Sequence, residues 1–113
     1  MNFLIRILVS ALVAFGLSYI LSGVHIDTFV TALIVAVVLA VLNALVKPIL
    51  VILTLPITIV TLGLFLFVIN ALIILLCDKL IAGFDVDGFW WALLFSILLS
   101  IVSSILYSAG KKD

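Results

Sequence analysis

Charged residues are scarce in this chain: they make up 9% of its 113 residues, and five basic residues balance five acidic ones. With no net positive charge, the sequence gives no indication of nucleic-acid binding. The single cysteine excludes an intramolecular disulfide and a cysteine-based metal cluster. Because 69% of the residues are hydrophobic, a soluble domain of this length would lack the polar surface to cover itself. The composition therefore predicts a membrane protein.

Groups that carry catalytic or transport chemistry are also missing. The polar residues in the middle of the long apolar stretches are serine, threonine and asparagine, and none is ionisable. Ionisable residues at such places usually mark proton relays or ion pathways, so a proton-coupled pump or ion carrier is disfavoured. No nucleophile with a neighbouring base, no glycine-rich phosphate loop and no metal-binding cluster within one stretch is present. We expect a protein that is not an enzyme and has no cofactor.

The apolar residues fall into four stretches, each about as long as the roughly 20 residues that a helix needs to cross a bilayer. We predict membrane-spanning helices at about 3–21, 28–46, 57–77 and 89–107, in a single membrane domain of residues 1–113. The alternation typical of a transmembrane barrel is absent, so the predicted fold class is an all-α membrane protein. The first stretch is too long for an ordinary signal peptide and another span follows at once, so we expect it to be retained.

Residues 48–55 do not fit a simple count of four helices. This apolar segment lies between Pro48 and Pro56, and it is too short to cross a bilayer yet too apolar for a solvated loop. It is therefore predicted to lie in the membrane interface, to form a re-entrant hinge, or to continue the second span past a kink at Pro48. A tight turn between two spans is a further alternative, since proline is common at helix starts.

The basic residues predict the orientation of the chain. Arg6, Lys47, Lys111 and Lys112 fall on the first, middle and last connections, whereas the other two loops carry only Lys79. Because cytoplasmic connections are enriched in lysine and arginine, both termini and the middle connection are predicted to be cytoplasmic.

Two loops, sixty positions apart, have nearly the same sequence: G-V-H-I-D-T-F-V-T-A-L at 23–33 and G-F-D-V-D-G-F-W-W-A-L at 83–93. Each would connect an outward span to an inward one, so the copies would be parallel repeats about an axis along the membrane normal. The chain is thus predicted to form two helical hairpins of the same orientation. A loop pattern shared without common ancestry is the alternative.

Within these loops, residues 24–26 and 84–86 alternate apolar and polar side chains as a strand does. We predict that they pair as a short external two-stranded β ribbon that joins the hairpins. If the segments lay further apart than a strand spacing of about 5 Å, this prediction would be wrong. His25 and the nearby aspartates would offer ligands for a divalent cation if the loops meet, although solvated loop polarity is the favoured interpretation.

Polar and small residues inside the spans indicate packing faces. Asn43 and Asn70 have similar settings, L-N-A-L-V and I-N-A-L-I, and are predicted to hydrogen-bond across helices, at about 0.6 kcal/mol each. A role in lining a pore is the alternative. Small residues repeat at helical spacing in the fourth span, and there they favour close helix packing, contact with a second subunit or a narrow aqueous path. These serines are Ser96, Ser100, Ser103 and Ser104.

The stretch 42–72, followed by 83–93, contains the elements N-A-L-x-K-P, L-P-x-T and G-F-x-x-x-G-F-W-x-A-L. In this combination it resembles the phage holin family 4, superfamily IV, also known as the YvlD-like family. The resemblance implies a bacterial cytoplasmic-membrane protein with about four spans, and it assigns no activity. The residues at the motif positions are Asn43, Lys47, Pro48, Pro56, Thr58, Gly63, Asn70, Gly83, Gly88, Phe89 and Trp90. With Gly23, Asp27 and Asp87 of the repeated loops, they are the candidate structural residues.

Two classes of function remain open. One is a structural or envelope-stress-associated membrane module that binds lipid or another membrane protein through the ribbon and the outer aromatic belt. The belt is predicted from Tyr19, Phe89, Trp90 and Trp91. The other is a holin-like pore, formed when several copies associate through their small-residue faces. The sequence favours the first, because no helix has the wide polar stripe expected of a pore lining.

Overall fold

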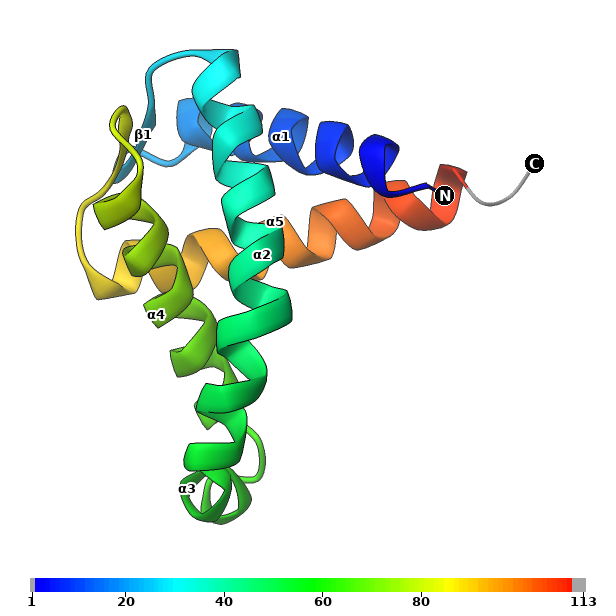
Figure 1. The fold of residues 1–113 in the computed structure, drawn as a ribbon. Coiled ribbons are helices and arrows are strands. Elements are labelled where there is room, and N and C mark those ends of the chain that lie inside the picture. Colours follow the sequence, from blue (N-terminus) through cyan, green and yellow to red (C-terminus); the bar gives the residue numbers. More distant parts are fainter. Residues whose placement is uncertain (1, 111–113) are drawn as a thin grey trace.

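A computed structural model describes residues 2–110 and shows a mostly helical chain with one small sheet (Figure 1). The elements are α1 (Phe3–Ile20), β1 (Val24–Ile26), α2 (Phe29–Leu53), α3 (Leu55–Val60), α4 (Phe65–Leu80), β2 (Phe84–Val86) and α5 (Phe89–Gly110). Asn2 begins α1, because its side-chain oxygen accepts a hydrogen bond from the Ile5 N–H at 2.9 Å. Thr28 begins α2 in the same way, with the Thr31 N–H as donor.

Three helices in the described part of the chain, α1, α2 and α5, are long and apolar enough to cross a membrane. Helix α4 has 16 residues and a length of about 24 Å, which is shorter than a full span. The stretch expected to form one span at about 57–77 is divided in the structure. Its first residues belong to α3 and to a turn, and α4 continues three residues past Cys77 to Leu80.

Helix α2 passes through Pro48 without ending and reaches Leu53, so residues 48–53 continue the helix. The helix ends where the Thr54 hydroxyl donates to the Leu50 carbonyl at 2.7 Å. Pro56 then lies in the first turn of α3, where its missing N–H is not needed. The prolines therefore mark a long helix and the start of a short one.

The turn between α3 and α4 explains why the predicted span is divided. The Gly63 N–H donates to the Thr58 carbonyl at 2.8 Å, which is the bond that closes a helix with a left-handed residue at its end. That residue is Leu62, with φ of 57°. The Thr61 hydroxyl then accepts the Phe65 N–H, the first N–H of α4, at 3.1 Å. These hydrogen bonds stop α3 and start α4 in a new direction.

A leucine in the left-handed conformation leads to a first prediction. Leu62→Gly should raise the free energy of unfolding by roughly 0.5–1 kcal/mol, because glycine adopts this conformation without the steric cost of a side chain. Leu62 is 93% exposed, so little packing within the chain is lost. The measurement is unfolding in mixed detergent micelles, followed by helical circular dichroism. The control is Leu64→Gly, where φ is −62° and glycine should destabilise; a gain in both variants would contradict the conformational argument.

The four long helices form a ring in which each contacts two others. Helix α1 packs on α2 and α5, and α4 also packs on α2 and α5, while close backbone approach is absent between α1 and α4 and between α2 and α5. In Figure 1, α1 and α5 extend together to one side of the molecule, whereas α2 and α4 extend together toward α3. The two pairs of helices therefore diverge away from the ribbon.

The hydrophobic core holds the ribbon against the helices. The side chain of Phe84 in β2 is fully buried and its ring lies 5.9 Å from that of Phe95 in α5. Val24 in β1 and Val35 in α2 are also fully buried. The end of the helix ring near the ribbon is thus filled by large apolar side chains.

Buried positions recur sixty residues apart along the chain. Residues buried at both members of such pairs are Ala11 and Ala71, Val13 and Ile73, Ala14 and Ile74, Leu17 and Cys77, Leu21 and Ile81, Val24 and Phe84, Ile26 and Val86, Ala32 and Ala92, Val35 and Phe95, and Ala36 and Ser96. The same positions of each half of the chain therefore face the core.

Candidate functional site

The predicted ribbon is present. Strands β1 and β2 pair antiparallel, with Val24 opposite Val86 and His25 opposite Asp85. The apolar members of both strands are buried, whereas His25 and Asp85 are exposed. The period-two alternation in the sequence therefore corresponds to a ribbon with one face packed on the core and the other face exposed.

The two repeated loops hold each other by reciprocal hydrogen bonds. The Asp27 N–H donates to the Gly83 carbonyl at 3.0 Å, and the Asp87 N–H donates to the Gly23 carbonyl at 2.7 Å. A side chain at Gly23 would collide with the Trp91 ring, and one at Gly83 would collide with the Asp27 carboxylate. Both glycines therefore allow close approach of the other half of the chain.

The remaining candidate residues of the repeated loops lie at the same end. The His25 Nε2 and the Asp87 Oδ2 are 3.4 Å apart, and both side chains are more than half exposed. Gly88 has a φ of +112° just before α5, where Phe89 packs edge-on against Trp90. Within residues 2–110, no group of three histidine, cysteine or acidic side chains is placed to hold a metal ion.

Sequence reasoning missed a contact at Asp78. Its Oδ2 accepts a hydrogen bond from the Val86 N–H at 3.1 Å, which ties β2 to the last turn of α4. An aspartate near the C-terminal end of a helix is opposed by the helix dipole. That unfavourable placement was the signal that the carboxylate has a partner elsewhere.

Away from the ribbon, three adjoining cavities of about 440, 240 and 60 Å³ lie between the diverging helices. Leu39 and Asn43 border all three. We call this space the polar crevice. Its polar lining consists of Arg6, Ser10, Asn43, Lys47, Asn70, Ser96, Ser100, Ser103, Ser104 and Tyr107.

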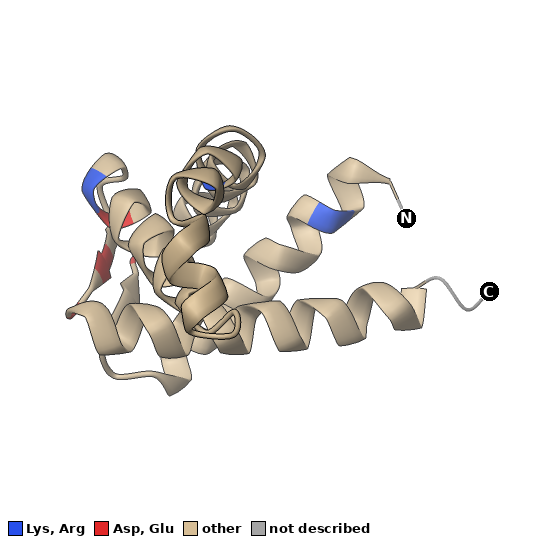
Figure 2. Ribbon diagram, turned by 90° about the horizontal axis from the view of Figure 1, so that it is seen from below, with Lys and Arg blue, Asp and Glu red and all other residues tan. Residues whose placement is uncertain are grey.

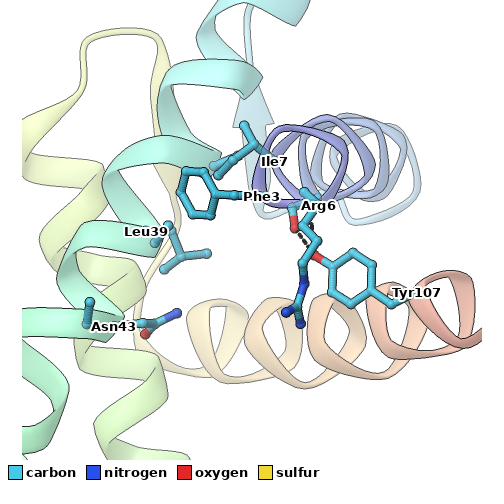
Figure 3. Close-up of a pocket in the computed structure, with 10 residues that line it drawn as sticks. Phe3, Arg6, Ile7, Leu39, Asn43 and Tyr107 are labelled. Atoms are coloured by element: carbon cyan, nitrogen blue, oxygen red, sulfur yellow. Dashed lines mark hydrogen bonds between the residues drawn. The ribbon is translucent and has the colours of Figure 1, made fainter. Parts of the chain in front are cut away.

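One side of the polar crevice is held by contacts between α1 and α5 (Figure 3). The Tyr107 hydroxyl donates to the Arg6 carbonyl at 3.2 Å and also hydrogen-bonds with the Ser10 hydroxyl. The Arg6 guanidinium lies over the Tyr107 ring, 4.6 Å from its centre. In Figure 3 the Arg6 guanidinium and the Asn43 amide point into the same space. The sequence gave no sign of these contacts of Tyr107.

The structure brings Asn43, Lys47 and Asn70 together around the smallest of the three cavities. Within the described residues, neither asparagine side chain makes a hydrogen bond, so the expected bonds across helices are not found in a single copy. The Ser103 hydroxyl is buried and has no partner in residues 2–110. The polar crevice therefore offers several uncommitted hydrogen-bonding groups.

The charges of the described residues are divided between the two regions. The acidic side chains gather at the ribbon end (Figure 2). They are Asp27, Asp78, Asp85 and Asp87, and one basic residue, Lys79, lies at the same end. No acidic residue lines the polar crevice, whereas Arg6 and Lys47 do. The crevice is therefore a basic and hydroxyl-rich space, and the ribbon end is acidic.

Long apolar helices with a small sheet at one end define a helical membrane protein. Residues 1–105 match the family described as "Mycobacterial 4 TMS phage holin, superfamily IV", and the chain belongs to this family. The resemblance seen in the N-A-L-x-K-P and G-F-x-x-x-G-F-W-x-A-L elements is thereby confirmed.

Two relatives extend this finding. The chain is 40% identical over 98 residues to the "Uncharacterized membrane protein YvlD" of Bacillus subtilis, covering 86% of this chain and 82% of that protein. It is 49% identical over 77 residues to the "Uncharacterized protein SCO3922" of Streptomyces coelicolor, covering 65% of this chain and 62% of that protein. No matching solved structure was found. The first relative is described as a membrane protein, and neither description states an activity.

Proposed function

We propose that the protein is a structural module of the bacterial cytoplasmic membrane that is not an enzyme. The observation that carries this proposal is the pair of reciprocal hydrogen bonds between the repeated loops, at Gly23 and Gly83. In the proposed arrangement these bonds lock two helical hairpins together outside the bilayer. Such a clamp fixes the relative position of the hairpins and provides no reactive group. Asp27 and Asp87, which supply the donors, act as structural residues.

In this proposal the hairpins are parallel repeats. The first is formed by α1 and α2, and the second by α4 and α5, with α3 and α4 together taking the third passage through the membrane. Support comes from the buried positions that recur sixty residues apart and from the equivalent helix contacts of the two halves. Asn43, Lys47 and Asn70 line the interior, and Pro48 and Pro56 shape the connection between the hairpins.

The proposed orientation places the ribbon outside and both termini in the cytoplasm. The acidic side chains at the ribbon end and the basic Arg6 and Lys47 away from it support this orientation. Lys111 and Lys112, which contributed to the prediction, lie outside the described residues.

Single cysteines at Ser108 and Asp85, introduced after Cys77→Ser, should react with an impermeant thiol reagent from the inside and outside respectively.

A holin-like pore is the second candidate function, and it requires several copies. A single copy is closed at the ribbon end by the buried rings of Phe84 and Phe95. Helix α5 exposes Ser100, Ser104 and Ser108, a small-residue face on which a second copy could pack. In that case the protein would have a second copy as a partner besides the surrounding lipid. Another membrane protein could also bind at the exposed Trp90.

Dye release separates the two candidates. Liposomes loaded with a small fluorescent dye should stay intact at high protein density if the protein is a structural module. Leakage that rises more steeply than linearly with protein density would overturn this proposal in favour of a pore. The matched variant Ser104→Leu should then abolish leakage, since it blocks the small-residue face without altering the ribbon.

A further inference from the structure

We propose that the polar crevice binds the phosphate group of an anionic phospholipid, held by Arg6, Asn43 and Lys47. This inference rests on the proposed function, because it takes the crevice to open toward the cytoplasmic leaflet. It adds a ligand to the proposed structural module.

Charge is the first argument. Arg6 and Lys47 line adjoining cavities, and neither has an ion-pair partner within residues 2–110. Basic groups without carboxylates attract anions, and phosphate oxygens accept hydrogen bonds from guanidinium and ammonium groups. Basic pockets between membrane helices on the cytoplasmic side recognise anionic lipid headgroups. A phosphate beside Asn43 would lie between the two cations.

Uncommitted hydrogen-bonding groups are the second argument. Ser103 is only 5% exposed, yet its hydroxyl has no partner in the described chain, and it lines the 240 Å³ cavity. Buried hydroxyls are normally hydrogen-bonded, so this one is an uncommitted group at the wall of the crevice. The Asn43 amide borders all three cavities and is equally free to donate.

The apolar walls indicate a lipid phosphate and argue against a soluble one. The 440 Å³ cavity is bordered by Phe3, Ile7 and Leu39 next to Arg6. This volume accommodates a headgroup and not a complete lipid. Phe3 is 63% exposed, so an acyl chain can leave the cavity along its ring into the bilayer. The site thus has a polar end and an apolar opening, which match the headgroup and the acyl chains of a lipid.

Native mass spectrometry of the delipidated protein in detergent tests this site. Added phosphatidylglycerol should be retained about tenfold more strongly than phosphatidylcholine of the same acyl chains. Arg6→Gln and Lys47→Gln should each reduce this preference several-fold. Lys79→Gln is the matched control, because Lys79 lies at the ribbon end of α4 and should leave the preference unchanged. Far-UV circular dichroism shows that each variant is folded.

Equal retention of the two lipids by the wild type, or an equal loss in Lys79→Gln, would overturn the site. Displacement of phosphatidylglycerol by millimolar glycerol 3-phosphate would overturn the lipid as its ligand and assign a soluble phosphate ester. The dye-release measurement separates the two proposals. If the protein prefers phosphatidylglycerol but also releases dye, only the structural function is overturned. If it shows no such preference and releases no dye, only the lipid site is overturned.

Discussion

Gly83→Ala is expected to lower the free energy of unfolding by about 2–4 kcal/mol, the largest effect among the glycines of the chain. Two costs combine at this position. Its φ of +91° is a conformation that alanine rarely adopts. The added methyl group would also lie 2.4 Å from the Asp27 Oδ2, inside the contact that holds the two loops together.

Three other glycines separate these costs. Gly88 has a φ of +112° but open space around it, so Gly88→Ala should show only the conformational cost of about 1–2 kcal/mol. Gly23 has no such φ, but a methyl group there would lie 2.1 Å from the Trp91 ring, so Gly23→Ala should show only the collision. Gly16 lies within α1 with neither feature. Gly16→Ala should be neutral or stabilising by roughly 0.5–1 kcal/mol.

Reversible unfolding in mixed detergent micelles, followed by circular dichroism, gives the four values. The combined cost at Gly83 should approach the sum of those at Gly88 and Gly23. A loss at Gly83 no larger than at Gly88 would show that the Asp27 carboxylate moves aside freely. The close approach of the two loops would then not be a fixed feature of the fold.

The ribbon could be predicted from sequence because its signals are local. Alternation at residues 24–26 and 84–86 defines the strands, and the repeated Gly23 and Gly83 define their ends. The division of residues 57–77 could not be predicted in the same way. The left-handed position before Gly63 is taken by Leu62, which is apolar and reads as part of a continuous span. Turn chemistry at this point depends on one unfavoured residue that the surrounding hydrogen bonds hold in place.

The polar crevice was only partly predictable. Asn43, Asn70 and the serines of the fourth span were identified among the polar residues within the spans, but their surroundings depend on how far the helix pairs diverge. The sixty-residue offset gives part of the answer, because it pairs Ser10 with Asn70 and Lys47 with Tyr107. All four line the crevice. The contact of Arg6 with the Tyr107 ring has no local signal, since α1 and α5 are the two ends of the chain.

Phe84→Ala is expected to cost about 3–5 kcal/mol, because it removes a large, fully buried ring from the core. The size of this loss depends on whether unfolding exposes the ring to water or to lipid. Phe84 belongs to the ribbon, which the proposed orientation places in water, so unfolding of the ribbon exposes the ring to water. Phe95 is equally buried but lies in a proposed membrane span, where unfolding exposes the ring to lipid. Lipid chains are as apolar as the core, so Phe95→Ala loses packing and little hydrophobic stabilisation.

The comparison of Phe84→Ala with Phe95→Ala therefore tests the placement of the ribbon as well as the packing of the core. The same unfolding measurement in micelles should give a greater loss for Phe84→Ala. Phe84→Leu, which keeps most of the volume, should cost less than about 1.5 kcal/mol, and Phe67→Ala, at a side chain 43% exposed on α4, should cost little. If Phe95→Ala proved the more damaging, the ribbon would lie within the apolar phase. The reciprocal hydrogen bonds of Asp27 and Asp87 would then be a clamp inside the bilayer, where unpaired backbone groups are most costly.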